Sequence, residues 1–287
     1  MRRIVISFVI LLGLPLLFVL VAPKAIPSRS DGCALTAFDV GQGDAILLRS
    51  SDGQDVLIDA GPGDRVIDGL ERHLPYGDQD IELLILTHPD ADHIGGAAAV
   101  FERYDVRTVL ESGVTASTGT DDRRRAAQTA EGSLVKIART GQQFTLGEHL
   151  TIDVLWPAGE WMERIDPTSD DLRNETSVVV RATCNGSTVM LTGDASVDVE
   201  ERMILSGENL QAAALKLGHH GARTSTSSAF VRAVDPQIGL VSVGANNRYG
   251  HPTADVLERM AMFNVSVRRT DLEGDIQVRS DGEGGWR

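Results

Sequence analysis

Cysteine is scarce in this chain, whose 287 residues include only Cys33 and Cys184. Two cysteines so far apart exclude a zinc finger, because that site needs closely spaced pairs of ligands. Each cysteine lies at the end of a strand-like segment, so the sequence is equally compatible with a disulfide and with two free, buried thiols.

Basic residues are also in the minority: 27 Lys and Arg are outnumbered by 41 Asp and Glu, for a formal net charge of −14. This charge opposes non-specific adhesion to phosphate polymers. It does not exclude a phosphate substrate, because bound divalent cations would reverse the local field. The only basic run, residues 123–125, is expected to be a solvated helix face balanced by Asp121 and Asp122.

Only one long stretch lacks charge, residues 4–22, which follow Arg2 and Arg3. Its 19 residues exceed the apolar core of a secretory signal and approach the length of a membrane-spanning helix. Because Pro23 follows and no A-x-A cleavage site is present, we expect an uncleaved transmembrane anchor. The domains expected are the anchor at 1–25, a linker at 26–32 and a catalytic domain at 33–287. The positive-inside tendency places this domain outside the cytoplasm, in the periplasm or at the cell surface.

The most informative segment, residues 87–96, places four metal-competent side chains within six residues: His88, Asp90, Asp92 and His93. A strand-like apolar run precedes the segment and an Ala-rich, helix-like run follows it. Pro89 and the paired glycines argue against a helix here, so we expect a strand-to-helix loop that holds ligands around a cation. A polar surface turn seldom has this alternating order behind an apolar strand. The segment therefore predicts a metal-dependent hydrolase.

Further candidate ligands follow other apolar, strand-like runs. Taken singly they are weak signals, because Asp–Gly turns and isolated histidines are common. Taken together they are informative, because five of the seven histidines lie at such positions. The residues that share this placement are His88, His93, His219, His220, His251, Asp39, Asp59 and Asp194.

Five segments together resemble the metallo-β-lactamase superfamily and, within it, the extracytoplasmic hydrolase domain of the competence protein ComEC. The segments are F-D-V-G-Q-G-D at 38–44, T-H-P-D-A-D-H-I-G-G at 87–96, L-T-G-D at 191–194, G-H-H-G-A-R-T-S-T-S at 218–227 and N-R-Y-G-H-P at 247–252. The resemblance extends from about residue 33 to residue 278.

The resemblance implies an α/β fold, a four-layer αββα sandwich of two mixed sheets with helices outside and metals at one edge. Interleaved strand and helix signals agree with that architecture, and no internal repeat is found. Helices are expected at 65–73, 94–104, 197–205, 228–234 and 254–263.

The resemblance also implies a set of ligands for two divalent ions. His88 and Asp90 would bind the first ion, Asp92 and His93 the second, and Asp194 would bridge them. Either His219 or His220 would complete the second site, while the other contacts substrate or carries a proton.

The first site departs from the superfamily signature. Asp90 stands where a histidine is usual, and no histidine lies between His149 and Asp194 to act as a third ligand, so Asn174 is the candidate to line that vacancy. Oxygen ligands favour manganese or magnesium relative to zinc. The expected cofactors are therefore two ions of manganese or zinc, with magnesium as a further candidate.

Other residues receive roles from the same resemblance. Asp59 and Asp39 would orient the ligating imidazoles or brace the loops, and capping of a turn is an equally good assignment for Asp39. His251 would give a proton to the leaving group, and with Asp92 and Asn247 it forms the expected catalytic set. The residues expected to contact the anionic oxygens of the substrate are Asn247, Arg223, Thr224 and Ser225.

The reaction expected is two-metal hydrolysis of a phosphodiester, in which a bridging water attacks while the cations stabilise the developing charge. The resemblance implies single-stranded DNA as a substrate and competence as a context. No protein partner follows from the sequence, and the membrane is expected to be contacted through the anchor. Three alternatives remain: a small-molecule phosphodiesterase of the envelope, a lactonase or β-lactamase, and a binding module without activity.

Overall fold

The computed structural model describes residues 32–164, 166 and 172–287. The predicted anchor at residues 4–22 lies outside this part of the chain. Among the described residues, no helix is long and apolar enough to cross a membrane.

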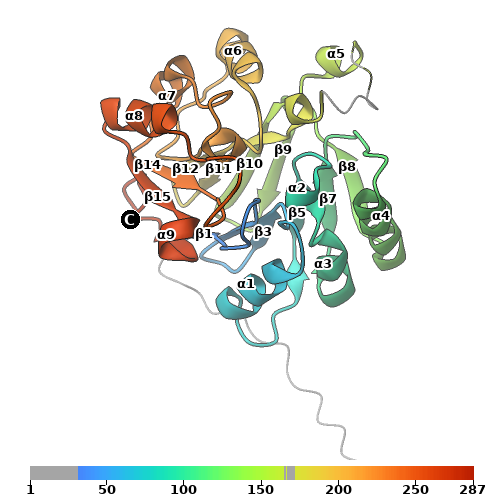
Figure 1. Cartoon of the computed structure of the whole chain (residues 1–287). Helices are drawn as coiled ribbons and strands as arrows, with labels where there is room; N and C mark the ends of the chain where they lie inside the picture. The colour runs from blue at the N-terminus through green and yellow to red at the C-terminus, as the bar shows by residue number, and fades with distance from the viewer. Residues whose placement is uncertain (1–31, 165, 167–171) are drawn as a thin grey trace, which may run out of the picture.

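Two mixed sheets of seven strands each form the centre of the fold (Figure 1). The first has the order β16 (Ile276–Arg279), β1 (Ala34–Ala37), β2 (Ile46–Arg49), β3 (Asp55–Ile58), β5 (Leu83–Leu86), β7 (Thr108–Glu111) and β8 (Leu134–Ile137). The second has the order β15 (Ser266–Arg269), β14 (Ile238–Val241), β13 (Ala214–Lys216), β12 (Ser187–Leu191), β11 (Val179–Cys184), β10 (Leu150–Trp156) and β9 (Gln143–Leu146). A small parallel pair joins β4 (Asp80–Ile81) to β6 (Asp105–Val106).

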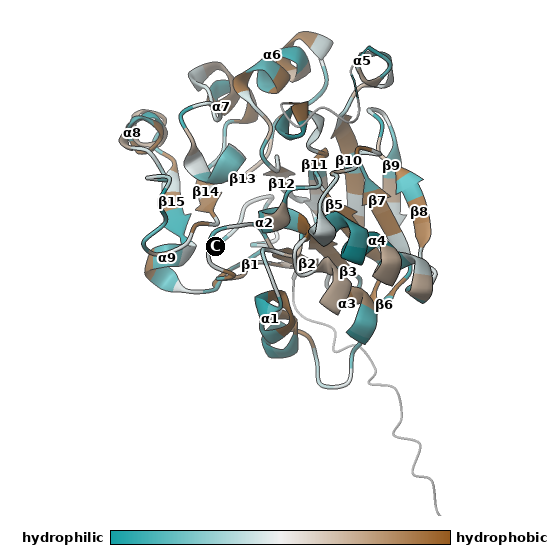
Figure 2. Ribbon diagram, turned by 45° about the vertical axis from the view of Figure 1, so that its right-hand side comes forward, coloured by the Kyte–Doolittle hydropathy of each residue, from teal (hydrophilic) through white to brown (hydrophobic). Residues whose placement is uncertain are grey.

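Helices cover the outer face of each sheet (Figures 1 and 2). The first sheet is covered by α1 (Arg65–His73), α3 (Ala97–Arg103) and α4 (Gly119–Glu131), and the second by α6 (Val197–Ser206), α7 (Ser228–Val234) and α8 (Ala254–Met262). Shorter elements are α2 (Ala91–Ile94), α5 (Gly159–Met162), α9 (Thr270–Glu273), η2 (Asn174–Thr176) and η3 (Gly218–Gly221). This arrangement confirms the predicted four-layer αββα sandwich.

Three apolar clusters fill the three interfaces between the four layers. Strand β5 shows how the sequence specifies which cluster each side chain enters, because side chains alternate between the two faces of a strand. Leu83 and Ile85 enter the cluster between the sheets, whereas Leu84 and Leu86 enter the cluster beneath α1 and α3. A fully apolar run therefore indicates a strand that is covered on both faces.

Two local predictions need correction. The helix expected at 94–104 is divided into α2 and α3 by Gly95 and Gly96, whose added Cβ atoms would come within 2.5 Å of neighbouring carbonyl oxygens. The basic run at 123–125 is not wholly solvated. Arg124 is buried on α4 and donates to Asp121 and to Glu111. These two carboxylates compensate the charge of the guanidinium, which burial removes from water.

A disulfide joins the two sheets. Cys33 directly precedes β1 and Cys184 ends β11, and their Cα atoms lie 6.1 Å apart. Both residues are buried in the cluster between the sheets. The structure thus decides between the two alternatives that the sequence leaves open, in favour of pairing.

Candidate metal centre

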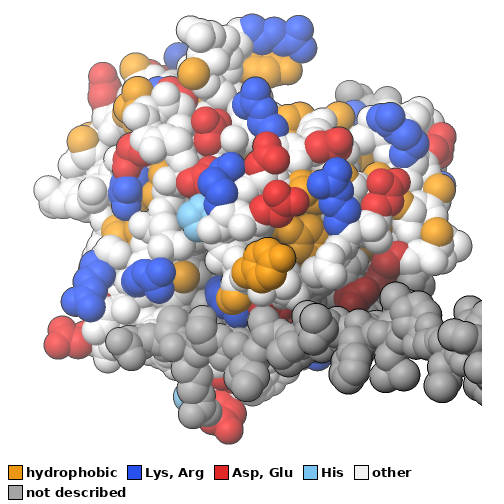
Figure 3. Space-filling model, turned by 90° about the horizontal axis from the view of Figure 1, so that it is seen from below, with side chains coloured by type: hydrophobic (Ala, Val, Ile, Leu, Met, Phe, Trp, Pro, Cys, Tyr) orange, Lys and Arg blue, Asp and Glu red, His pale blue; other side chains and the backbone are white. Residues whose placement is uncertain are grey.

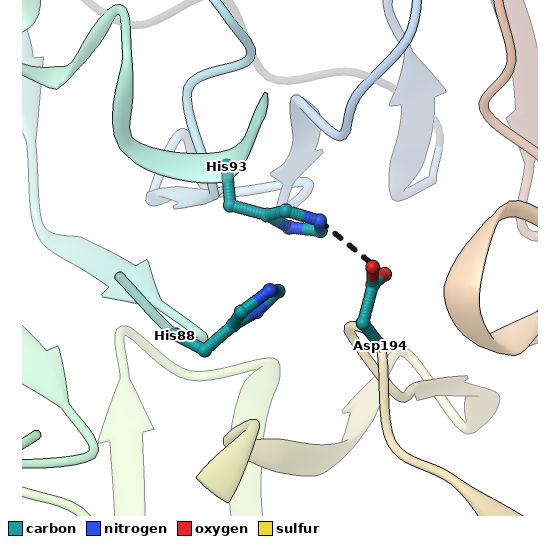
Figure 4. Close-up of side chains that lie close together, drawn as sticks. All are labelled: His88, His93 and Asp194. Carbon is teal, nitrogen blue, oxygen red and sulfur yellow. Dashed lines mark ion pairs between the residues drawn. The ribbon is translucent and has the colours of Figure 1, made fainter. Parts of the chain in front are cut away.

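The segment that follows β5 turns sharply and places two histidines side by side. His88 lies in the turn and His93 on α2, and their ring centroids are 4.1 Å apart. Both side chains are fully enclosed. Figure 4 shows the two rings pointing toward the same space as Asp194.

Asp194 reaches this space from the loop after β12 of the other sheet. Gly193 makes the approach feasible, because its φ is +51° and an added Cβ would lie 2.9 Å from the Cβ of Thr87. Asp194 Oδ1 lies 3.3 Å from His93 Nε2, the contact marked in Figure 4. The loops after β5 and β12 therefore meet at one edge of the sandwich.

The structure distinguishes the two adjacent histidines of η3. The Nδ1–H of His220 donates to the carbonyl of Ser242 at 2.9 Å, which turns Nε2 toward Asp92 Oδ2 at 3.4 Å. His220 is buried, whereas the side chain of His219 is 32% exposed and its Nε2 lies 3.5 Å from Asp194 Oδ2. His220 is accordingly the better placed ligand, and His219 faces the substrate side.

Buried partners fix the ligating rings from behind. His93 Nδ1 lies 2.7 Å from Asp59 Oδ2, and the hydroxyl of Thr87 donates to the same oxygen at 2.8 Å. His88 Nδ1 lies 3.1 Å from that hydroxyl. Each Nε2 is thereby directed inward, as expected for imidazoles that bind metal. Asp39 takes the other role allowed for it, because its carboxylate accepts from the backbone N–H of Gly41 and is exposed.

The cluster fits a divalent cation. Four of the converging ligand atoms are buried without a hydrogen-bond partner among the described residues: His88 Nε2, His93 Nε2, His220 Nε2 and Asp194 Oδ1. Ligand atoms of His88, His93 and Asp194, and likewise of Asp92, His93 and His220, lie within 4.8 Å of one another. Unpaired buried polar atoms are costly in an apo cluster, and bound cations would satisfy them.

Protonation at the centre differs between the ligands. At His93 and His220 burial would lower the pKa, but Asp194 and the other nearby carboxylates raise that of His93 well above its usual value and that of His220 to about 9, so these two rings must release a proton before they bind metal. The other ligands already have the form that binds metal. Burial and the neighbouring His93 lower the pKa of His88 to about 3, so its imidazole is neutral. Burial would raise the pKa of Asp194, but His93 and His220 outweigh it and hold the value well below the usual range. Burial is likewise outweighed at Asp92, whose pKa falls to about 2. Neutral imidazole and ionised carboxylate are the forms that bind metal.

Two residues of the site have no predicted role from the sequence. Lys216 is buried on β13, and its ammonium contacts Asp44 and donates to the carbonyl of Gly193 at 3.1 Å. Asp44 Oδ1 lies 3.3 Å from His220 Nδ1, behind the ligating ring. The signal for Lys216 is a lone lysine within an apolar strand, and the signal for Asp44 is its place in the 38–44 segment.

The predicted first site differs most from expectation. Asp90 Oδ2 lies 3.7 Å from His88 Nε2, but Oδ1 is held at 2.6 Å by the guanidinium of Arg173. Asp90 belongs to none of the clusters of three or more converging ligand atoms found among the described residues. Asn174 instead lines a hollow of about 400 Å³ beside Asp194 and His219. Because Arg173 binds the carboxylate of Asp90, it competes with a cation for that carboxylate.

A cleft of about 210 Å³ opens onto the cluster. It is lined by Gln42, Asp90, Asp92, Asp194, His219, His220, Tyr249 and His251. His251 thus has the position predicted for it. Burial and the nearby His219 lower the pKa of His251, which favours the neutral ring.

The predicted substrate contacts are placed less well. Thr224 is exposed and lines the hollow beside Asp194. Ser225 is buried and its hydroxyl donates to the carbonyl of Gly218 at 2.6 Å, so it is not accessible to substrate.

The other two side chains are engaged elsewhere. The amide of Asn247 binds the backbone of His251 through both its nitrogen and its oxygen, which makes Asn247 a brace for its loop rather than a catalytic group. Arg223 points into solvent and pairs with Asp255 at 2.9 Å.

Comparison with known proteins agrees with this fold. A family model described as the metallo-beta-lactamase superfamily matches residues 38–245. The chain is 29% identical over 276 residues to ComE operon protein 3 of Bacillus subtilis (strain 168), covering 88% of this chain and 34% of that protein. It is 31% identical over 262 residues to competence protein ComA of Neisseria gonorrhoeae, covering 91% of this chain and 34% of that protein. The chain thus spans about a third of the length of both relatives.

A solved structure shows the same fold. The metallo-beta-lactamase fold protein YhfI from Bacillus subtilis aligns with a TM-score of 0.52 and 14% identity, covering 82% of this chain and 96% of that chain. The family match and the two relatives confirm the resemblance that the sequence motifs predict.

Proposed function

This chain belongs to the metallo-β-lactamase superfamily, and on that premise we propose that it is a ComEC-like, metal-dependent phosphodiesterase that cleaves single-stranded DNA. The observation that carries the proposal is the convergence of three imidazole nitrogens and a carboxylate oxygen, all buried and unpaired, beneath an open cleft. The relation to competence proteins supports DNA as the polymer.

His93, His220, Asp92 and Asp194 would hold one ion, and His88 with Asp194 would contribute to a second. Bound divalent ions activate water as a nucleophile and neutralise charge on the phosphodiester. Asp59 and Asp44 keep the rings of His93 and His220 in position.

The side chains of the cleft handle protons and substrate. His219 is partly exposed, faces the cleft and is placed to contact the phosphodiester. Neutral His251 lies beside it, with ring centroids 5.7 Å apart, and is placed to accept a proton.

The test uses protein stripped of metal with a chelator and reloaded separately with manganese, magnesium or zinc. Three substrates are compared: bis-p-nitrophenyl phosphate, a single-stranded oligodeoxynucleotide and a chromogenic cephalosporin. We expect hydrolysis of the first two and not of the third, because the first site lacks the histidine-rich set usual for β-lactam hydrolysis. Cleavage of the cephalosporin alone would refute the proposal.

A matched pair of variants separates the centre from the rest of the chain. His220→Gln removes a buried ligand and should lower both metal affinity and hydrolysis by about 10- to 100-fold, in the range seen for disturbed metal sites. His149→Gln alters an exposed histidine whose described ion-pair partner is Glu148, and it should leave both unchanged. Equal effects of the two variants would contradict the assignment.

Manganese should support faster phosphodiester hydrolysis than zinc at equal occupancy, because Asp92 and Asp194 supply hard oxygen ligands. Metal content is measured beside rate, since zinc binds most such sites more tightly. A faster zinc enzyme at full occupancy would contradict this expectation.

We also propose that the domain lies outside the cytoplasm, held by the anchor at 1–25. The disulfide between Cys33 and Cys184 supports this, because such bonds persist in oxidising compartments. Protease added to intact spheroplasts should digest the domain, and protection until lysis would show that the orientation is wrong.

A further inference from the structure

An aromatic side chain stands at the mouth of the metal cleft. Tyr249 lies in the loop between β14 and α8 and is 56% exposed, yet it lines the same cleft as Asp92 and His220. Asn247 braces this loop, because its amide donates to the carbonyls of Gly244 and His251 and accepts from the backbone N–H of His251. Tyr249 therefore presents its ring from a supported position.

A series of rings leads from Tyr249 to the metal ligands. The rings of Tyr249 and His251 are stacked, with centroids 5.8 Å apart and planes 24° apart. His251 meets His219 edge-on with centroids 5.7 Å apart, and His219 Nε2 lies 3.5 Å from Asp194 Oδ2. A ligand that contacts the ion through one group would therefore have its neighbouring group beside Tyr249.

The basic groups near the cleft are too few to bind a polyanion by charge alone. Arg248 lies over the Tyr249 ring at 5.2 Å, and Arg223 is paired with Asp255. Arg173 pairs with Asp90, which lines the cleft. Figure 3 shows a different view, from below, in which Lys and Arg side chains are likewise interspersed with Asp and Glu. Affinity for a nucleic acid must then come from a source other than many phosphate contacts.

We infer that Tyr249 stacks against an unpaired nucleobase beside the scissile phosphodiester and thereby makes this centre select single strands over duplexes. The inference rests on the phosphodiesterase function proposed above. Stacking on an aromatic ring tolerates any base, because every base has a π-face, whereas both faces of a base inside a duplex are covered by its neighbours. The guanidinium of Arg248 lies over the Tyr249 ring, where we expect the base to stack. A guanidinium and a base can take the same position because both are planar groups that stack on aromatic rings.

The test compares wild-type protein with Tyr249→Ala, Tyr249→Phe and Tyr76→Ala. Tyr76 is fully exposed and lines a separate hollow, so Tyr76→Ala is the matched control for loss of a surface tyrosine. Substrates are a single-stranded oligonucleotide, the same strand with abasic residues around the cleavage position, and bis-p-nitrophenyl phosphate. Binding of both strands is also measured by fluorescence anisotropy in chelator.

We expect Tyr249→Ala to lower the ratio of kcat/KM for the normal strand to kcat/KM for bis-p-nitrophenyl phosphate by about tenfold or more, as loss of one base–aromatic stack does elsewhere. Tyr249→Phe keeps the ring and should retain the ratio, as should Tyr76→Ala. Wild-type protein should bind the normal strand more tightly than the abasic strand, and Tyr249→Ala should remove that difference.

Equal treatment of normal and abasic strands by wild-type protein would overturn the inference, as would equal losses in Tyr249→Phe and Tyr249→Ala. If the protein distinguishes the strands in binding but cleaves no phosphodiester with any metal, the proposed function fails and the stacking assignment stands. If it neither binds nor cleaves, both fail.

Discussion

Replacement of Lys216 by Met should destabilise the protein more than any surface substitution, because it leaves a buried carboxylate without its partner. The ammonium of Lys216 is buried against Asp44, lies 3.8 Å from Asp194 Oδ1 and donates to Gly193 O at 3.1 Å. Removing one member of a buried ion pair typically costs about 3–5 kcal/mol. We expect a loss of that size in the free energy of unfolding.

The assay is a double-mutant cycle of Lys216→Met and Asp44→Asn, measured by urea unfolding in chelator so that metal binding does not contribute. Asp44→Asn removes the charge that Lys216 balances, so the double variant should lose less than the sum of the single variants, with a coupling of about 2 kcal/mol. Lys136→Met is the matched control, because Lys136 is exposed on β8, and it should change stability by no more than about 0.5 kcal/mol. Additive single losses would refute the pairing.

The pH dependence has a defined sign. Burial would raise the pKa of Asp44, but Lys216 and His220 lower it, so its contribution to stability is present above about pH 4 and is lost on acidification. Burial would lower the pKa of Lys216, but Asp44 and Asp194 raise it, so its contribution persists up to about pH 10. The gap in unfolding free energy between wild-type protein and Lys216→Met should be widest between about pH 4 and pH 10 and should narrow as the pH falls below about 4.

Three further predictions concern the centre and the core. Asp194→Asn removes the carboxylate proposed to contact both ions and should abolish phosphodiester hydrolysis while leaving the circular dichroism spectrum unchanged; full turnover at full metal content would contradict the site. Arg173→Met frees Asp90 from its ion pair and should raise the number of manganese ions bound per chain, by calorimetry and metal analysis, whereas an unchanged stoichiometry would show that the pair does not block the first site. Cys33→Ser removes the link to Cys184 and should lower stability by about 2–5 kcal/mol and Tm by roughly 5–15 °C, and an unchanged melting curve would show that the bond contributes nothing.

Local sequence determined the elements and the first ligands. Residues 65–73 and 228–234 are helices with the predicted bounds, because their apolar periodicity is satisfied within each segment. The close spacing of His88, Asp92 and His93 brought them to one loop and the following turn of helix without any information about distant segments. Asp59 was also recognisable, since it directly follows the apolar run at 56–58.

Pairings across the fold were decided only by the tertiary structure. The contact between Asp44 and Lys216 joins residues from opposite sheets, and the sequence shows neither distance nor burial. Cys33 and Cys184 are brought together by the packing of the two sheets, although each occupies an unremarkable strand end. The choice of His220 over His219 depends on which ring finds the carbonyl of Ser242, a residue from a different strand end. In each case the deciding contact is made between residues that lie far apart in the sequence and close together only after the two sheets pack, so no local sequence pattern predicts it.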